Sequence, residues 1–510
     1  MLQNSARWIG FIAMCLGMFM AILDIQIVVT SLPAISAALD IPNEQMSWVQ
    51  TAYLIAEVIA IPLTGFLTRC LSLRGLFLIS LSVFLLASVG CAYSDGFVPL
   101  IIARTVQGFS GGCLIPLVFS AVFLLFPEKK QAIATTIAGG LAVLAPTIGP
   151  TVGGYITDTF DWSWLFLVNI LPGIVALAIA AMTVPREDTR LDLLSRLDWV
   201  AVILLAIGLT CLEIGLKDGP SDGWTALPVL VLLTVSVLAA GGFIARSLTA
   251  ATPVARLRLF TDRNFAVACG LSFLFGIGLF ASVYLMPVFL GLVRGHSPLE
   301  IGLTMLVTGA AQLATAPIAV QLERRIDPRL LSVIGFIGFA IGLGMSGFQT
   351  TATDFDEMFW PQIVRGVSIM FCLLPPTRLA LGLLRPEDVP DGSALFNLMR
   401  NLGGAIGIAL VDTILWQRAP HHAAALGDRV LAKDPEAAGF VGIPLDMVPS
   451  DGAPLSPEVM SFVRPMFEKA GLVLAVNEAW LVIGGLTALG LALLPAAYPM
   501  KPGGRPPHGH

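Results

Sequence analysis

The sequence predicts an all-α membrane protein that crosses the bilayer many times, and three observations lead to this prediction. Hydrophobic residues make up 56% of the 510 residues and charged residues only 12%, whereas soluble proteins carry about 25% charged residues. The mean hydropathy is +0.85. The apolar residues are gathered into runs of about 20 or more, the length that a helix needs to span a bilayer.

Fourteen runs reach this length. In chain order, we expect membrane-spanning helices at residues 8–31, 46–68, 75–94, 98–126, 132–156, 164–184, 198–216, 225–245, 264–292, 299–322, 330–349, 358–384, 392–416 and 475–498. An even number of spans places both termini on one side. The short connections on the opposite side contain only Lys217 and Arg294, and positive residues favour the cytoplasmic side. Both termini are therefore predicted to lie inside.

The spans fall into groups of six, two and six, because charged connectors at 185–198 and 246–263 bracket the seventh and eighth spans. The expected units are a six-helix bundle (1–190), two linker helices (191–250), a second six-helix bundle (251–500) and a disordered tail (501–510). The second bundle includes a long polar outer loop at 417–474. For this loop, which holds His421 and His422, a solvated chain is favoured over a partner-binding surface.

The fifth span has an unusual composition, with two prolines and five glycines between residues 139 and 154. Gly149 and Gly153 are four residues apart, so they share a face and allow another helix to approach closely. Pro146 and Pro150 each remove a backbone donor and bend the helix. We expect a kinked helix with a smooth flank, ending at Gly154. It serves either for packing or as a pivot between two moving halves.

Ionisable residues within the spans are candidates for function, because a charge is costly inside a bilayer. Asp24 lies in the middle of the first span and is a candidate for proton exchange. Arg104, in the fourth span, cannot lose its charge, and Asp24 is its natural partner. Gln107 follows Arg104 by about one turn, and Glu57 follows Tyr53 by four residues on the second span.

Several of these segments resemble motifs of the major facilitator superfamily. Ala145-x-x-x-Gly149-Pro150-x-x-Gly153-Gly154 resembles its antiporter motif, with Ala145 in a place that is usually Gly. Arg104, three residues before Gln107-Gly108, resembles its fourth-helix motif. Leu23-Asp24 followed by Ile27-Val28 and Leu32-Pro33 is similar to the first helix of its fourteen-span drug/proton antiporters.

The second half extends this resemblance. Asn397-Leu-Met-Arg400, with Gly403 and Gly407 after it, and Trp360-Pro-Gln362-Ile-Val-Arg365-Gly366 are similar to the same branch. We expect Gly403 and Gly407 to support close helix packing. The resemblance implies a major facilitator fold with two additional helices, N-in and C-in. It also implies a candidate substrate cavity containing Gln107, Tyr53, Gln26, Asn397, Arg400, Gln362 and Asp412.

Two features depart from the branch. Arg69 stands where the second-loop motif of the superfamily has Asp, so the inner latch ascribed to that Asp is in doubt. Acids at Glu57, Glu213 and Asp412 are not required by the pattern. Glu57 is expected beside the central cavity, Glu213 at the periphery, and Asp412 near water at the outer end of its span.

The function implied is export of lipophilic or amphipathic drugs, driven by protons and without a cofactor, with Asp24, Glu57 and Arg104 in proton coupling. The expected location is the plasma membrane, or the inner membrane in a Gram-negative cell. The branch implies a periplasmic adaptor and an outer-membrane channel as partners. Export of one endogenous metabolite, such as a siderophore, fatty acid or self-made antibiotic, remains an alternative, as does a non-transporting sensor or scaffold.

Other classes are excluded by the residues themselves. The sequence has no G-x-x-x-x-G-K-[ST] motif for ATP, and no basic patch for nucleic acid. Its five histidines lie in predicted outer loops or the tail, so neither an enzyme nor a metal site is expected. The seven cysteines lie in or beside apolar runs and imply no disulfide framework. A cleavable signal peptide is not expected, because the first run is long enough to span and carries Asp24.

Overall fold

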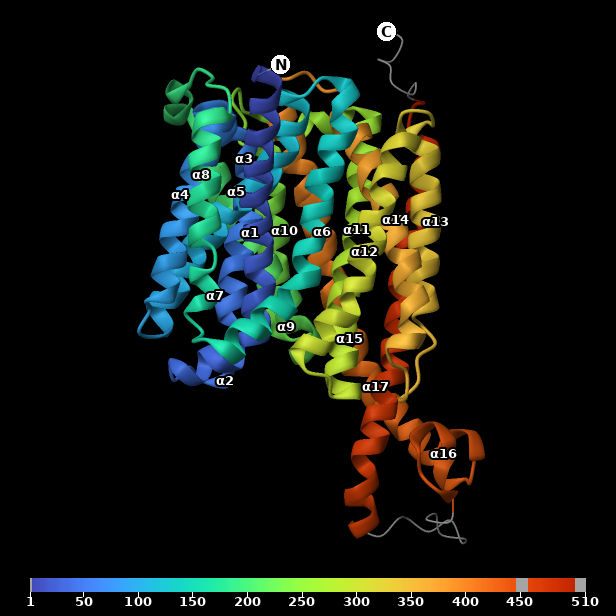
Figure 1. Cartoon of the computed structure of the whole chain (residues 1–510). Helices are drawn as coiled ribbons and strands as arrows, with labels where there is room; N and C mark the ends of the chain where they lie inside the picture. Colours follow the sequence, from blue (N-terminus) through green and yellow to red (C-terminus); the bar gives the residue numbers. More distant parts are fainter. Residues whose placement is uncertain (1, 446–456, 500–510) are drawn as a thin grey trace.

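A computed structural model describes residues 2–445 and 457–499, and these residues form helices and no strand (Figure 1). The long helices are α1 (Leu2–Ala38), α3 (Trp48–Leu71), α4 (Leu73–Ala92), α5 (Phe97–Leu125), α6 (Glu128–Thr159), α8 (Ile170–Thr183), α9 (Trp199–Asp222), α10 (Leu227–Thr249), α11 (Arg263–Phe289), α12 (Pro298–Glu323), α13 (Pro328–Met345), α14 (Phe355–Leu381), α15 (Val389–Leu431) and α17 (Pro457–Ala488). The short ones are α2 (Asn43–Met46), α7 (Trp164–Leu167), α16 (Pro435–Val441), α18 (Gly490–Leu493) and the turns η1 (Leu191–Arg196), η2 (Leu257–Thr261), η3 (Leu290–Arg294) and η5 (Leu494–Ala496).

The number of spans agrees with the prediction. Thirteen helices of the described residues are long and apolar enough to cross a bilayer, with α7 and α8 together forming one of them. The fourteenth is α6, whose segments Glu128–Pro146 and Ile148–Thr159 meet at 46°. The kink predicted from Pro146 and Pro150 is therefore present, and its bend lies between these two prolines.

Separate apolar cores hold the two ends of the chain. One core is formed mainly by α1, α3, α4, α5 and α8, and another by α11–α14, α15 and α17. Helices α6 and α12 lie side by side where these parts meet (Figure 1). A Cβ added at Gly302 of α12 would collide with Thr151 of α6, which shows how closely the two backbones approach.

Helices α9 and α10 pack against each other, and α9 also packs against α3 of one part and α15 of the other. Gly208 of α9 faces the backbone of α10 at Ser236 and Ala240. Apolar residues of α9, such as Leu205, share a buried cluster with Ile61 of α3 and Leu395 of α15. The two helices that the sequence assigns to a linker thus contact the junction between the two apolar cores.

The segment expected as a polar loop at 417–474 is mostly helical. Helix α15 continues to Leu431, α16 follows, and α17 begins at Pro457. Together they form an extension that protrudes from the bundle (Figure 1). Its own small apolar core, which includes Leu426, Val430, Val463 and Phe467, explains why these residues adopt helices rather than a solvated loop. The expected disordered tail, 501–510, lies outside the described residues.

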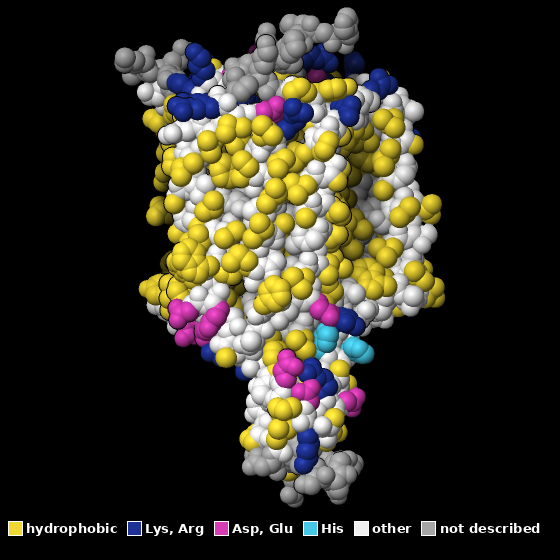
Figure 2. Space-filling view, turned by 90° about the vertical axis from the view of Figure 1, so that its right-hand side faces the viewer, with side chains coloured by type: hydrophobic (Ala, Val, Ile, Leu, Met, Phe, Trp, Pro, Cys, Tyr) yellow, Lys and Arg dark blue, Asp and Glu magenta, His cyan; other side chains and the backbone are white. Residues whose placement is uncertain are grey.

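Charge is distributed unevenly between the two ends of the bundle. On the face shown in Figure 2, Lys and Arg gather at the end where α1 begins, apolar side chains cover the middle, and acidic residues are prominent at the opposite end. The extension projects from that opposite end, and histidine side chains lie near its base in Figure 2. His421 and His422 belong to α15, ten or fewer residues before its end at Leu431. This pattern is the one that the distribution of Lys and Arg along the sequence predicts.

Candidate functional site

A buried polar cluster surrounds Asp24 of α1. Its side chain is 0% exposed. Arg104 of α5 donates from Nη1 to Oδ2 and forms an ion pair with it. Oδ1 accepts hydrogen bonds from Nε2 of Gln107 at 3.0 Å and from Nδ2 of Asn169 at 2.8 Å. The predicted pairing of Asp24 with Arg104 is thus confirmed, and both carboxylate oxygens are occupied.

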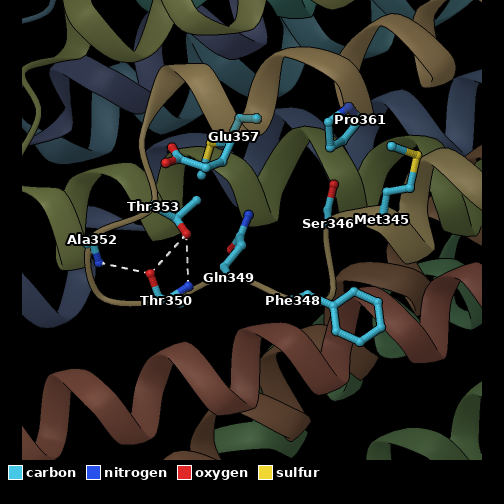
Figure 3. A pocket seen from close by; sticks show the side chains of 10 residues that line it. Met345, Ser346, Phe348, Gln349, Thr350, Ala352, Thr353, Glu357 and Pro361 are labelled. Atoms are coloured by element: carbon cyan, nitrogen blue, oxygen red, sulfur yellow. Dashed lines mark hydrogen bonds between the residues drawn. The ribbon is translucent and has the colours of Figure 1, made fainter. Parts of the chain in front are cut away.

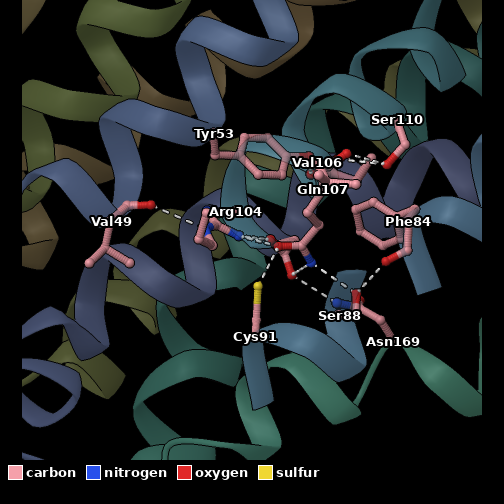
Figure 4. A network of polar contacts seen from close by, with 12 residues as sticks. Val49, Tyr53, Phe84, Ser88, Cys91, Arg104, Val106, Gln107, Ser110 and Asn169 are labelled. Atoms are coloured by element: carbon pink, nitrogen blue, oxygen red, sulfur yellow. Dashed lines mark hydrogen bonds and ion pairs between the residues drawn. The ribbon is translucent and has the colours of Figure 1, made fainter. Parts of the chain in front are cut away.

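Gln107 connects this pair to α4 (Figure 4). Its Nε2 also donates to Oγ of Ser88 at 2.9 Å, while its Oε1 accepts from Nη1 of Arg104 at 2.7 Å. Ser88 in turn donates to the carbonyl of Phe84. Because the Gln107 amide has both donors and an acceptor, this one side chain contacts the Asp24 carboxylate, the Arg104 guanidinium and Ser88 of α4.

Arg104 is held by the second long helix as well. Its Nε donates to the carbonyl of Val49 at 3.1 Å, and its guanidinium lies 4.4 Å from the ring centre of Tyr53. The Tyr53 hydroxyl donates to the carbonyl of Ala21 at 2.9 Å. A cation over an aromatic face gains more when it is shielded from water, as it is here. The predicted residues Asp24, Tyr53, Arg104 and Gln107 therefore form one cluster.

The chemistry of this cluster follows from its charges. Burying two ions is expensive, and the cost is offset only when each charge is paired and hydrogen-bonded. Protonating Asp24 would remove the negative charge, whereas Arg104 cannot lose its positive charge. One proton therefore changes a neutral pair into a buried cation, which is the kind of event that can bias two arrangements of packed helices.

Sequence reasoning missed Asn169 and Ser88. Asn169 is the only strongly polar side chain between Trp164 and Thr183, so its position in an apolar run was the available signal. Ser88 carried a weaker signal, because a serine in a membrane helix commonly bonds to its own backbone. Neither residue is ionisable, which is why a search for charges did not find them.

Glu57 lies outside the hydrogen-bond network around Asp24. It is buried on α3, within electrostatic reach of Arg104 of that network, of Arg400 of α15 and of Glu213 of α9. Arg400 donates from Nη2 to Oδ1 of Asn397 and lies 5.4 Å from the ring centre of Phe119. Glu57, Asn397 and Arg400 therefore form a second group, at the junction of the two apolar cores. Glu213, expected at the periphery, contributes charge to this group.

The remaining predicted cavity residues lie elsewhere. Gln362 of α14 accepts a hydrogen bond from Thr308 at 3.0 Å. Asp412, expected simply to reach water, is partly buried and accepts from the Tyr284 hydroxyl at 2.6 Å. Gln26 of α1 packs against α6, because a Cβ at Gly149 would collide with it. The structure thus distributes the predicted cavity residues over separate places.

The glycines and prolines of α6 lie where the predicted pivot was placed. Gly149, Pro150, Gly153 and Gly154 are all buried. On its other side α6 meets α14, where a Cβ at Gly139 would collide with Leu373. In α15, a Cβ at Gly403 would overlap the carbonyl of Phe273, and one at Gly407 would lie 2.8 Å from that of Ile277. The close packing predicted for Gly403 and Gly407 is confirmed.

Ion pairs join the two parts at the end where α1 begins. Arg69 of α3 pairs with Asp391 of α15, and Arg256 lies 3.7 Å from the same carboxylate. Arg378 of α14 reaches Glu128 of α6 at 3.4 Å. The sequence left a latch in doubt because Arg69 replaces an Asp. In the structure Arg69 is paired across the two parts, with the acid supplied by α15, and we name this group of ion pairs the latch.

Comparison with known proteins agrees with this architecture. The family model described as Major Facilitator Superfamily matches residues 14–408. The chain belongs to this superfamily. It is 38% identical to "Colistin resistance protein EmrB" of Acinetobacter baumannii, over 82% of each chain. It is 30% identical to "Multidrug export protein EmrB" of Escherichia coli K12, over 98% of this chain and 96% of that one.

A solved structure of the superfamily has the same fold. The human organic anion transporter MFSD10 matches with a TM-score of 0.60, at 14% identity, over 96% of this chain and 99% of that one. The chain is therefore a multi-pass membrane transporter of the major facilitator fold and not an enzyme. Its described residues contain no group of three or more His, Cys, Asp or Glu that could hold a metal ion.

Proposed function

We propose that this major facilitator exports lipophilic or amphipathic drugs in exchange for protons, by alternating access. The observation that carries the proposal is the fully buried Asp24, held between Arg104, Gln107 and Asn169. The names of the two bacterial relatives, a colistin resistance protein and a multidrug export protein, support export of drugs.

In the proposed cycle, the two moving halves are residues 1–190 and 251–500, with 191–250 joining them. A proton from outside binds Asp24 and releases Arg104 from its ion pair. Glu57, facing Arg400 of the other half, is the candidate for a second coupling acid. Helix α6, with Pro146, Pro150 and its buried glycines, supplies the contact about which the halves rock.

The proposed setting is the bacterial inner membrane, with both termini in the cytoplasm. The gathering of Lys and Arg at the end where α1 begins supports this orientation. The helical extension then projects outward from the opposite end, and it is the surface that we assign to a periplasmic adaptor. Such an adaptor, with an outer-membrane channel, would complete a three-part pump.

Proton release on substrate binding tests the proposal directly. Purified protein in weakly buffered detergent is mixed with lipophilic cations, anions and neutral drugs, and the pH is followed with a dye. We expect substrate to release protons from the wild type and none from Asp24→Asn. Asp158→Asn, which removes an exposed carboxyl, is the matched control and should behave as wild type. Undiminished release from Asp24→Asn would exclude Asp24 as the coupling acid.

A further inference from the structure

Arg365 of α14 is a buried cation for which the described residues supply no ion pair. Arg365 is 4% exposed. Its guanidinium carbon lies 4.6 Å from the ring centre of Trp480, and Nη2 makes only a weak 3.6 Å contact with Sδ of Met286. The Nε atom has no hydrogen-bond partner. A cation buried in a membrane bundle is costly unless something compensates its charge.

Two more buried donors beside Arg365 lack acceptors. Nε2 of Gln362 and Nε1 of Trp480 are both without a partner. Gln362 is 0% exposed and lies one turn before Arg365 on α14, while Trp480 is 1% exposed and contacts the guanidinium from α17. Buried donors are almost always satisfied in folded proteins. Gln362 and Arg365 share a face of α14 at this spacing, so the unsatisfied donors of Gln362, Arg365 and Trp480 indicate a site for a group that only accepts.

The first half of the chain shows what such a donor set holds. Val106-Gln107-Gly108 of α5 corresponds to Val364-Arg365-Gly366 of α14. The correspondence is also structural, because a Cβ at Gly108 would collide with the carbonyl of Tyr53, and one at Gly366 with the carbonyl of Thr308. Arg104 and Gln107 thus occupy the places of Gln362 and Arg365, with the two residue types exchanged.

In the first half, this place contains a carboxylate. Asp24 of α1 accepts from Arg104, Gln107 and Asn169. The corresponding helix of the second half is α11, which contains no Asp or Glu between Arg263 and Phe289 and presents Met286 to Arg365. The donors are therefore repeated in the second half, and the carboxylate is not.

We propose that Arg365, Gln362 and Trp480 bind the carboxylate of an amphipathic anionic substrate, in the place that Asp24 fills in the first half. This inference rests on the proposed export function and names a substrate class for it. A guanidinium and a carboxylate make strong paired hydrogen bonds. Met286, which contacts the guanidinium, is suited to contact an apolar body beside the carboxylate.

A cavity lies next to this site, toward the end opposite the ion-pair latch. It has a volume of about 280 Å³ and lies between the end of α13 and the start of α14 (Figure 3). Two of its lining residues, Ser346 and Pro361, are each one turn from the place where Gly342 packs against Arg365. The cavity therefore lies about one helical turn along α13 and α14 from the proposed carboxylate site.

Binding of three twelve-carbon probes tests the proposal. The full chain in lipid nanodiscs is titrated with dodecanoate, dodecanamide and dodecyltrimethylammonium, and empty nanodiscs are subtracted. We expect Arg365→Met to raise the Kd for dodecanoate at least tenfold, which is about 1.4 kcal/mol, and to leave the Kd values of the other probes unchanged. Arg246→Met removes an exposed cation paired with Asp198 and is the matched control.

A second variant protects the test against misfolding. Trp480→Phe keeps an aromatic ring beside the guanidinium and removes only the indole donor, so we expect a smaller, dodecanoate-specific loss of affinity. Unchanged dodecanoate affinity in both Arg365→Met and Trp480→Phe would overturn the proposal. That result would leave the proposed function standing, provided that other substrates still release protons through Asp24. If dodecanoate binding depends on Arg365 but no substrate releases protons, this inference stands and the proposed function is overturned.

Discussion

At the scale of single residues, the Asp24 carboxylate is the group on which the other side chains of the cluster converge. It accepts from a cation and from two amides, one of which is Asn169 on the segment between α7 and α8. Removing a donor from a buried charged acceptor leaves part of that charge unsatisfied, at a cost of roughly 1–3 kcal/mol. This loss of stability should disappear when the Asp24 carboxylate, which is the acceptor, is also removed.

We therefore expect Asn169→Leu to lower the melting temperature in the wild-type background and to have little effect in an Asp24→Leu background. The two changes act through one hydrogen bond, so they should not add. Melting of purified protein, followed by intrinsic fluorescence, measures all four members of the cycle. Additive losses would mean that Asn169 contributes by packing alone.

The sequence predicted Asp24, Arg104, Gln107 and Tyr53 of this site and missed the neutral residues Asn169 and Ser88. Asp24 and Arg104 were found because an ionisable residue in an apolar run is rare and needs a partner. Asn169 has no charge, so its contribution depends on where the chain returns after α7, which spacing does not reveal. The partner of Arg69 was not predicted for a related reason, because Asp391 lies more than 300 residues away in the sequence.

At the scale of elements, α6 depends on small residues where it meets α1. A Cβ at Gly149 would collide with Gln26, whereas one at Gly140 on the same helix has its nearest neighbour, Leu313, 3.7 Å away. We expect Gly149→Ala to slow drug efflux at least tenfold, because α1 and α6 must separate to accommodate the methyl group. Gly140→Ala should transport normally. Efflux of a fluorescent drug from cells with matched expression measures both.

The two variants gain the same helix propensity, since alanine favours a helix over glycine by about 1 kcal/mol at either position. A difference between them therefore reports the contact and not the stiffness of α6. Equal transport by the two variants would show that α6 serves only for packing and that transport does not depend on the close contact at Gly149.

The helical extension should respond to acid through Asp434, which begins α16. Arg429 donates to its Oδ2 at 2.7 Å, and the N–H groups of Glu436 and Ala437 donate to Oδ1. The hydrogen bond from Arg429, with those from the backbone, lowers the pKa of Asp434 from its usual value. The ionised form therefore stabilises the fold, and this contribution is lost as the pH falls below about 4.

We expect faster amide hydrogen exchange in α16 at pH 3 than at pH 6, after correction for the intrinsic rates. Asp434→Ser keeps an oxygen at the helix start but cannot titrate, so its corrected exchange should depend less on pH. An unchanged pH dependence in Asp434→Ser would assign the effect to another acid.

The extension also shows where hydropathy fails as a guide. The thirteenth predicted span, 392–416, was expected to end where the apolar run ends, and in the structure the corresponding helix, α15, continues to Leu431. The continuation rests on apolar residues at helical spacing, such as Leu426 and Val430, that pack against α16 and α17. A span-length window averages these residues with their polar neighbours and therefore misses them.

At the scale of the whole molecule, the latch at Asp391 holds the two halves together at the basic end. Asp391 receives Arg69 from the first half, so its carboxylate bridges them. Asp391→Asn removes the charge and should favour opening at this end by roughly 1–3 kcal/mol. We expect a longer distance between spin labels placed at residues 188 and 387, measured by electron paramagnetic resonance.

Arg246→Ala breaks an exposed pair between α10 and the start of α9 and should leave that distance unchanged. If Asp391→Asn also leaves it unchanged, the second contact, between Arg378 and Glu128, is enough to hold this end closed.

The overall fold was accessible from the sequence because span number, charge alternation and apolar length are local properties. The positions of α9 and α10 were not, since their contacts depend on how both halves meet. Leu205, for example, is buried beside Ile61 and Leu395, residues that are distant in the chain.

The length of α15 has a mechanical consequence. Its 43 residues amount to about 65 Å of helix, and the same element runs from the latch at Asp391 through the membrane into the extension. If the second half tilts by roughly 10° about the latch, the far end of such a rod is carried sideways by about 11 Å. The far end of the extension would then move farther than the bundle does in each transport cycle. A protein bound to the extension could sense the state of the transporter without contacting the substrate.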